Sequence, residues 1–134
     1  MAERYSVSVG AGSLCIDDGV AVAHEWTGAG VTVDAPFTGA HLLHLAVAGC
    51  VLNDVYREAE KLGLRIDGVQ VTASGGFEDG TWRSTGIEYT VAVDSTLGSD
   101  EIERLLSVVD DVAEIPRALA AGTAVRRAGA GGPS

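Results

Sequence analysis

Apolar and polar residues alternate along the first third of the chain, a pattern typical of half-buried strands. Apolar side chains recur at positions 5, 7 and 9, and a second alternating face carries Val20, Val22, His24 and Trp26, which predicts two strands. The segment Asp17-Asp18-Gly19 between them has the composition of a hairpin turn. Residues 31–33 predict a short third strand, which Pro36 ends.

A long helix and a second hairpin follow. Thr38 is a suitable N-cap, and the apolar run after it continues to residue 61 or 62. Gly63 is then expected to take the left-handed conformation that ends a helix. Alternation returns at residues 69–73 and 87–93, on either side of a glycine-rich segment, and predicts an antiparallel hairpin.

The last third predicts an amphipathic helix. It begins at Ser99 or Asp100, and the acidic residues of its first turn interact favourably with the helix dipole. Pro116 is expected to break or kink it, and a further turn ends at Gly122. Residues 123–127 are predicted to add a last strand.

These elements together predict an α+β fold of antiparallel hairpins packed on two helices. A length of 134 residues suits one domain with a hydrophobic core. We expect that domain to span residues 1–127. The Gly/Pro/Ser-rich residues 128–134 are expected to form a disordered tail.

Charge and hydropathy narrow the range of partners and locations. A net charge of −10 argues against nucleic acid and against an anionic membrane surface, since both are bound through Lys and Arg. The longest apolar run, residues 40–52, is far too short for a transmembrane helix. The first residues lack the apolar core of a signal peptide, so we expect a cytoplasmic protein. Cys15 and Cys50 are then expected to be free thiols.

Cys50, in the middle of the long apolar helix, is the first candidate for chemistry. A thiolate is the reactive form, and an apolar setting raises the thiol pKa unless a cation or a hydrogen-bond donor offsets it. A buried free cysteine is also a common inert core residue. The residues alone leave both interpretations open.

The helix sequence GAHLLHLAVAGC at 39–50, reached from the extended Asp34-Ala-Pro36, resembles the central helix of the OsmC/Ohr family. Members of this family are small dimeric thiol peroxidases of bacteria. The amphipathic second helix and the position of Pro116 resemble the family as well. The resemblance implies an OsmC-like fold in which the long central helix is buried in an intertwined homodimer.

The resemblance also implies that Cys50 attacks a peroxide oxygen. In the family an arginine from an N-terminal loop and a glutamate before the helix assist, and a second cysteine in a Cys-Pro step resolves the product. Here the glutamate position falls at residues 38–40, the Cys-Pro step becomes Ile115-Pro116, and Arg4 is the only preceding arginine. The chain therefore resembles a divergent member that lacks the glutamate and the resolving cysteine. It would reduce organic hydroperoxides with Cys50 alone and an external thiol reductant.

A second hypothesis keeps the pocket but changes the chemistry. In it, acid–base groups isomerise, cyclise or cleave a small hydrophobic metabolite in a dimer-interface pocket. A third is a non-catalytic dimer that binds a hydrophobic ligand. The candidate catalytic residues are Cys50, His44 and Glu114, and the candidate substrate-binding residues are His24, Trp26, His41, Asn53, Asp54 and Arg57.

Each candidate also has an ordinary structural interpretation. Alternation places His24 and Trp26 on the inward face of the second strand, where a polar ring needs a partner or a cavity. The histidines of the long helix suit a hydrogen-bonded interface, and Asp54 with Arg57 suits a surface ion pair at i, i+3. Glu114 suits a solvated acidic helix face.

No metal or cofactor is expected. The sequence contains neither His-x-x-x-His nor Cys-x-x-Cys, and the pair His41/His44 is insufficient alone. The glycine pairs at 10–12 and 28–30 do not open a helix, so they fail the test for a dinucleotide loop.

Overall fold

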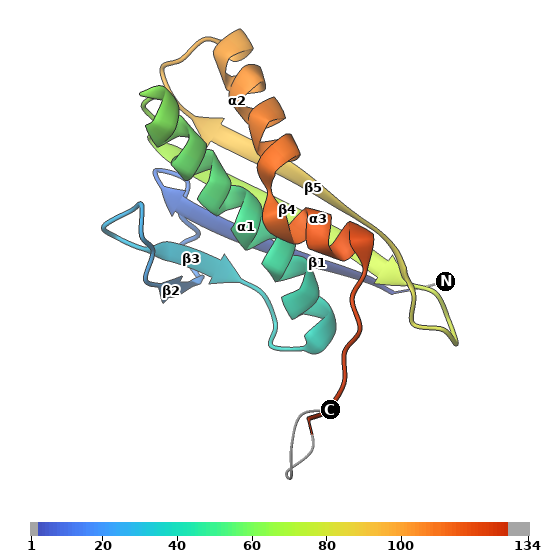
Figure 1. The fold of residues 1–134 in the computed structure, drawn as a ribbon. Coiled ribbons are helices and arrows are strands. Elements are labelled where there is room, and N and C mark those ends of the chain that lie inside the picture. Colours follow the sequence, from blue (N-terminus) through green and yellow to red (C-terminus); the bar gives the residue numbers. More distant parts are fainter. Residues whose placement is uncertain (1–2, 129–134) are drawn as a thin grey trace.

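The computed structural model describes residues 3–128 as one antiparallel sheet with helices on one of its faces (Figure 1). The strands lie side by side in the order β2-β3-β1-β4-β5. The elements are β1 (Arg4–Gly12), β2 (Val20–Val22), β3 (Val31–Asp34), α1 (Gly39–Leu62), β4 (Gly68–Phe77), β5 (Ser84–Asp94), α2 (Ser99–Val112) and α3 (Glu114–Ala121). This arrangement confirms the predicted α+β class. No helix in this part of the chain combines the length and the hydropathy needed to cross a membrane.

The long helix α1 has the predicted ends. Thr38 is its N-cap, and the Thr38 hydroxyl accepts a hydrogen bond from the backbone N–H of His41 at 3.1 Å. Gly63 ends it in the left-handed conformation at φ 69°. The buried side of α1 packs on β1 and β4 and forms the core with them (Val7, Val9, Val47, Ala48, Val51, Leu52, Val55, Val69, Val71 and Ala73).

The predicted hairpin of the first two strands is wrong. A strand has two edges, and those of β1 are taken by β3 and β4, so β2 pairs with β3 instead. β2 is the short outermost strand, and its residues Val20 and Val22 are exposed. Because β2 ends at Val22, His24 and Trp26 belong to the loop of residues 23–30, not to an inward strand face.

The second half of the chain confirms two predictions and corrects two. β4 and β5 form the expected hairpin, and α2 begins at Ser99 as expected. The helix break comes at Ala113, however, and Pro116 lies in the first turn of α3, where its missing N–H costs nothing.

The predicted last strand is also wrong. Residues 123–127 pair with no strand of the described chain, because Val125 is their single large apolar side chain and two arginines follow it. The predicted tail lies outside the described residues from position 129 onward.

Gly75 in β4 allows α1 to approach the sheet. A Cβ built at Gly75 would lie 2.4 Å from the carbonyl oxygen of Gly86 and 2.6 Å from Nε2 of the buried His44 ring. We expect Gly75→Ala to lower the free energy of unfolding by about 1–3 kcal/mol through overpacking, measured by urea unfolding. Gly49→Ala is the control, since its Cβ would meet no atom within 4 Å. Equal urea midpoints for the two variants would contradict this account.

Candidate active site around Cys50

A cavity of about 400 Å³ lies between the middle of α1, the first turn of α3 and the loop of residues 23–30. Helical spacing puts positions 46, 50, 53, 54 and 57 of α1 along one side of it. Its lining residues are Trp26, Ala46, Cys50, Asn53, Asp54, Arg57, Glu114 and Ile115.

Cys50 and Asp54 meet inside this cavity. The two residues are one helical turn apart, and Cys50 Sγ lies 3.9 Å from Asp54 Oδ2, with the thiol as donor. The side chain of Asp54 is only 3% exposed. Glu114 approaches both residues from α3. The Cys50 Sγ atom and one carboxylate oxygen each from Asp54 and Glu114 lie within 4.8 Å of one another.

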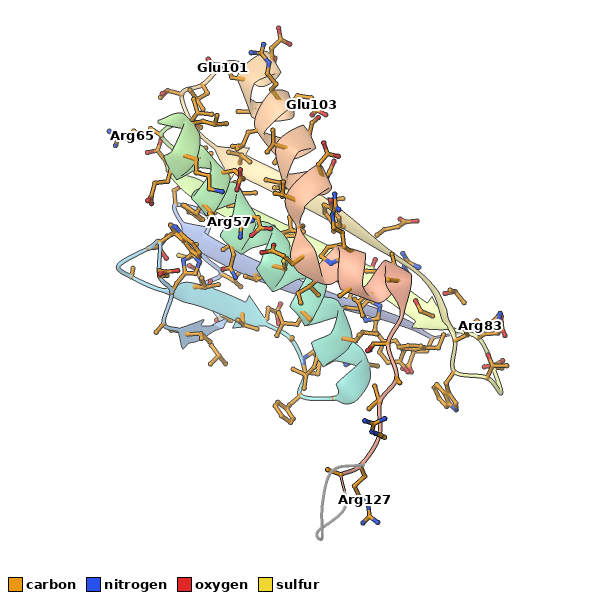
Figure 2. The ribbon with its side chains drawn as sticks, viewed as in Figure 1. Arg57, Arg65, Arg83, Glu101, Glu103 and Arg127 are labelled. Carbon is orange, nitrogen blue, oxygen red and sulfur yellow. The ribbon has the colours of Figure 1, made fainter. Side chains whose placement is uncertain are left out.

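Arg57 holds the acidic groups of the cavity together. Its guanidinium lies 3.2 Å from Asp54, 3.0 Å from Glu114 and 3.1 Å from Glu58. Figure 2 shows Arg57 near the centre of the helical layer, whereas Arg65 and Arg83 lie at the periphery of the molecule. The planar fork of an arginine suits simultaneous contacts with several carboxylates. Arg57 thereby links α1 to the first residue of α3.

The pKa values of the two carboxyl groups next to Cys50 are shifted in opposite directions. Burial, followed by a hydrogen bond with Glu114, raises the pKa of Asp54 to about 6. The hydrogen bond from Arg57, more than any other interaction, lowers the pKa of Glu114 to about 2. At neutral pH Glu114 is a stable carboxylate, while Asp54 can both accept and return a proton.

The pKa of the Cys50 thiol is raised above its ordinary value. Burial is the main cause, and the negative charges of Asp54 and Glu114 add to it. The backbone N–H groups of Ile115 and Glu114 act in the opposite direction, because they donate hydrogen bonds to the sulfur from the start of α3. The site therefore holds a protonated thiol with a base beside it and with donors directed at the sulfur.

The structure brings together six of the nine candidate residues and leaves three outside the cavity. Cys50, Glu114, Trp26, Asn53, Asp54 and Arg57 line it. His24 lies behind Asn53, and its Nε2 is 2.9 Å from Asn53 Oδ1. His41 and His44 are absent from the lining.

The two histidines of α1 contact an aromatic cluster at the sheet instead. The His41 ring meets the edge of Tyr5 and lies 2.6 Å from the Thr38 hydroxyl through Nδ1. The fully buried His44 packs against Tyr5 and Phe77 and donates from Nδ1 to the carbonyl oxygen of Ala40 at 2.7 Å.

Two features of the site were not predicted from the sequence. One is the pair of N–H groups at the start of α3. It was missed because the helix break was predicted at Pro116, whereas the break lies three residues earlier, at Ala113. The other is a second, largely apolar cavity of about 330 Å³ between α1, β5 and α3. Its lining residues are Leu43, Val47, Ser84, Gly86, Ile87, Tyr89, Pro116, Leu119 and Ala120.

Comparisons with known proteins agree with this architecture. A solved structure of an OsmC-like hydroperoxide resistance protein from Jannaschia sp. CCS1 superposes with a TM-score of 0.59 at 14% identity. The match covers 92% of this chain and 91% of that one, and at this identity it establishes the fold alone. No curated protein sequence matches the chain. The family model described as OsmC-like protein matches residues 33–126, and the chain therefore belongs to the OsmC-like family.

Proposed function

We propose that this protein is a one-cysteine, thiol-dependent reductase of organic hydroperoxides. The observation that carries the proposal is the Cys50 thiol in a cavity with Asp54, a base whose pKa of about 6 suits proton transfer at neutral pH. Family membership and the hydroperoxide resistance protein of the same fold support a peroxidase-type role.

In the first step, the Asp54 carboxylate takes the proton of the Cys50 thiol. The thiolate, stabilised by the N–H groups of Glu114 and Ile115, attacks the outer oxygen of the peroxide. A sulfur–oxygen bond forms as the oxygen–oxygen bond breaks, so the sulfur is oxidised to a sulfenic acid and the peroxide is reduced. Asp54 then returns its proton to the departing alkoxide, which leaves as an alcohol.

An external thiol completes the cycle. Cys15 is exposed in the loop after β1, and that loop contacts β3 and β4 through Ile16 and Leu14, not the Cys50 cavity. A thiol reductant attacks the Cys50 sulfenic acid and releases water, and a second thiol resolves the mixed disulfide. The proposal thus places the protein in a reducing compartment such as the cytoplasm.

The pH dependence of Cys50 oxidation tests the role of Asp54. With cumene hydroperoxide, we expect the rate to rise as pH increases through about 6, where the Asp54 carboxylate forms. In Asp54→Asn the rate should follow the Cys50 thiol alone, whose pKa burial raises, so the midpoint should move to higher pH than in the parent. Stopped-flow measurement in a Cys15→Ser background follows the single remaining thiol. An unchanged midpoint in Asp54→Asn would remove Asp54 from the mechanism.

A second function is favoured by one observation, the opposite pKa shifts of Asp54 and Glu114. Paired carboxyl groups with separated pKa values are a general arrangement for acid–base catalysis. We propose as the alternative an isomerase, cyclase or lyase step on a small hydrophobic metabolite. In that case Asp54 would transfer the proton and Cys50 would only line the pocket.

We further propose that the protein functions as a homodimer. Leu42, Leu43 and Leu45 of α1 remain half-buried and Ala46 is exposed, so one chain leaves part of this apolar helix uncovered. A second copy would cover it. Light scattering at micromolar concentration measures the mass directly, and a mass of one chain would contradict the proposal.

A further inference from the structure

The loop of residues 23–30 contains a tight turn at its end. The Thr27 hydroxyl donates to the carbonyl oxygen of Gly30 at 3.0 Å, and the Gly30 N–H returns to the Thr27 carbonyl oxygen at 3.1 Å. Gly30 has φ 85°, and a Cβ there would lie 2.6 Å from the Val22 carbonyl oxygen, so this position requires glycine. The turn is therefore a defined structure.

His24 joins that turn to α1. Its Nδ1 lies 2.8 Å from the Thr27 hydroxyl oxygen, and its Nε2 lies 2.9 Å from Asn53 Oδ1. The ring also packs edge-on against Tyr56 of α1 at 5.8 Å between centroids. A single imidazole thus fixes the position of the loop on the helix that carries Cys50.

Trp26 is the residue that this attachment places in the cavity. The His24 and Trp26 ring centroids are 5.6 Å apart, and Trp26 lines the cavity together with Cys50. The same cavity is also lined by three charged or titratable residues, Asp54, Arg57 and Glu114. The indole is the largest apolar side chain among the residues that line this cavity.

We propose that residues 23–30 form a lid in which Trp26 binds the organic group of the substrate and His24 is the positioning residue that holds Trp26 in place. The inference rests on the proposed function in taking the Cys50 cavity as the site of reaction. It assigns the substrate class more narrowly, as hydroperoxides with an aromatic or similarly bulky apolar group. Such groups gain contact with an indole that hydrogen peroxide does not.

The test measures reagent selectivity at Cys50 in a Cys15→Ser, Trp82→Phe background, which leaves one thiol and one tryptophan. Rates of alkylation are compared for iodoacetamide and N-benzyl iodoacetamide, and rates of oxidation for hydrogen peroxide and cumene hydroperoxide. We expect Trp26→Ala to lower both bulky-to-small rate ratios by about tenfold, with the small reagents within about twofold of the parent.

His24 is tested through the same ratios and through the fluorescence of Trp26. His24→Ala should lower the ratios nearly as far as Trp26→Ala and shift the emission of Trp26 to longer wavelength. His24→Gln, which can still hydrogen-bond, should recover most of both signals. Glu25→Gln is the matched control, because Glu25 is the exposed neighbour and should change neither. Parent-like ratios and emission in His24→Ala would overturn the positioning role.

The alkylation arm separates this inference from the proposed function. If the alkylation ratio falls in Trp26→Ala but neither peroxide oxidises Cys50, the lid is supported and the peroxidase proposal fails. If both peroxides oxidise Cys50 and neither ratio changes in Trp26→Ala, the lid inference alone is overturned.

Discussion

Cys50→Ser should abolish thiol-dependent consumption of cumene hydroperoxide, a loss of at least about a thousandfold that leaves only the background of the reductant. A serine hydroxyl remains protonated beside Asp54, and its oxygen cannot take up the peroxide oxygen as the Cys50 sulfur does when it becomes a sulfenic acid. The substitution keeps nearly the same volume in a half-buried position, so the fold should be retained. Peroxide consumption in the presence of excess dithiol is the measurement.

Cys15→Ser is the matched control for this prediction. Cys15 is the other cysteine of the chain and is exposed, so its replacement should leave turnover unchanged. Equal turnover in the two variants would end the redox proposal. Acid–base activity that survives Cys50→Ser but is lost in Glu114→Gln would then support the alternative. If the protein showed neither peroxide consumption nor acid–base activity, the remaining hypothesis would be a non-catalytic protein that binds a hydrophobic ligand.

Local signals in the sequence predicted the helices well, because the residues that end them act on their immediate neighbours. Thr38 caps the start of α1 and Gly63 ends it, each through contacts within one turn, and both were predicted. Strand pairing depends on residues far apart in the chain, which is why the hairpin of β1 and β2 was wrong. β1 pairs with β4 from Arg4↔Gly76 to Gly12↔Gly68, and no local turn signals such a contact.

The candidate site shows the same division. Cys50, Asp54 and Arg57 follow each other at helical spacing, so the sequence alone predicts their shared face. Glu114 comes from a separate helix, and the structure brings this candidate residue beside Cys50 and Asp54. His24 reaches Asn53 only because a loop folds over α1, and strand alternation gave no sign of that loop.

Arg57→Met should lower the free energy of unfolding by about 2–4 kcal/mol at neutral pH, since it leaves the buried Asp54 without its cation. The Glu58 side chain, 10% exposed, also loses its contact with Arg57. Methionine keeps much of the apolar stem of arginine, so the loss reports mainly on charge. Arg65→Met is the matched control, because the Arg65 side chain is 85% exposed and should change stability by less than about 0.5 kcal/mol.

The loss in Arg57→Met should depend on pH in a defined direction. The positive charge of Arg57 lowers the pKa of Asp54, so the variant should raise that pKa further above about 6 and raise the pKa of Glu114 from about 2. A carboxyl whose pKa is raised on folding costs stability as pH rises through the folded value, and one whose pKa is lowered loses its contribution as pH falls. The gap between parent and variant should therefore be largest above about pH 6 and should narrow towards about pH 2, as both carboxyl groups take up protons. Urea unfolding at several pH values measures it, and a gap independent of pH would show that Arg57 stabilises the fold through packing alone.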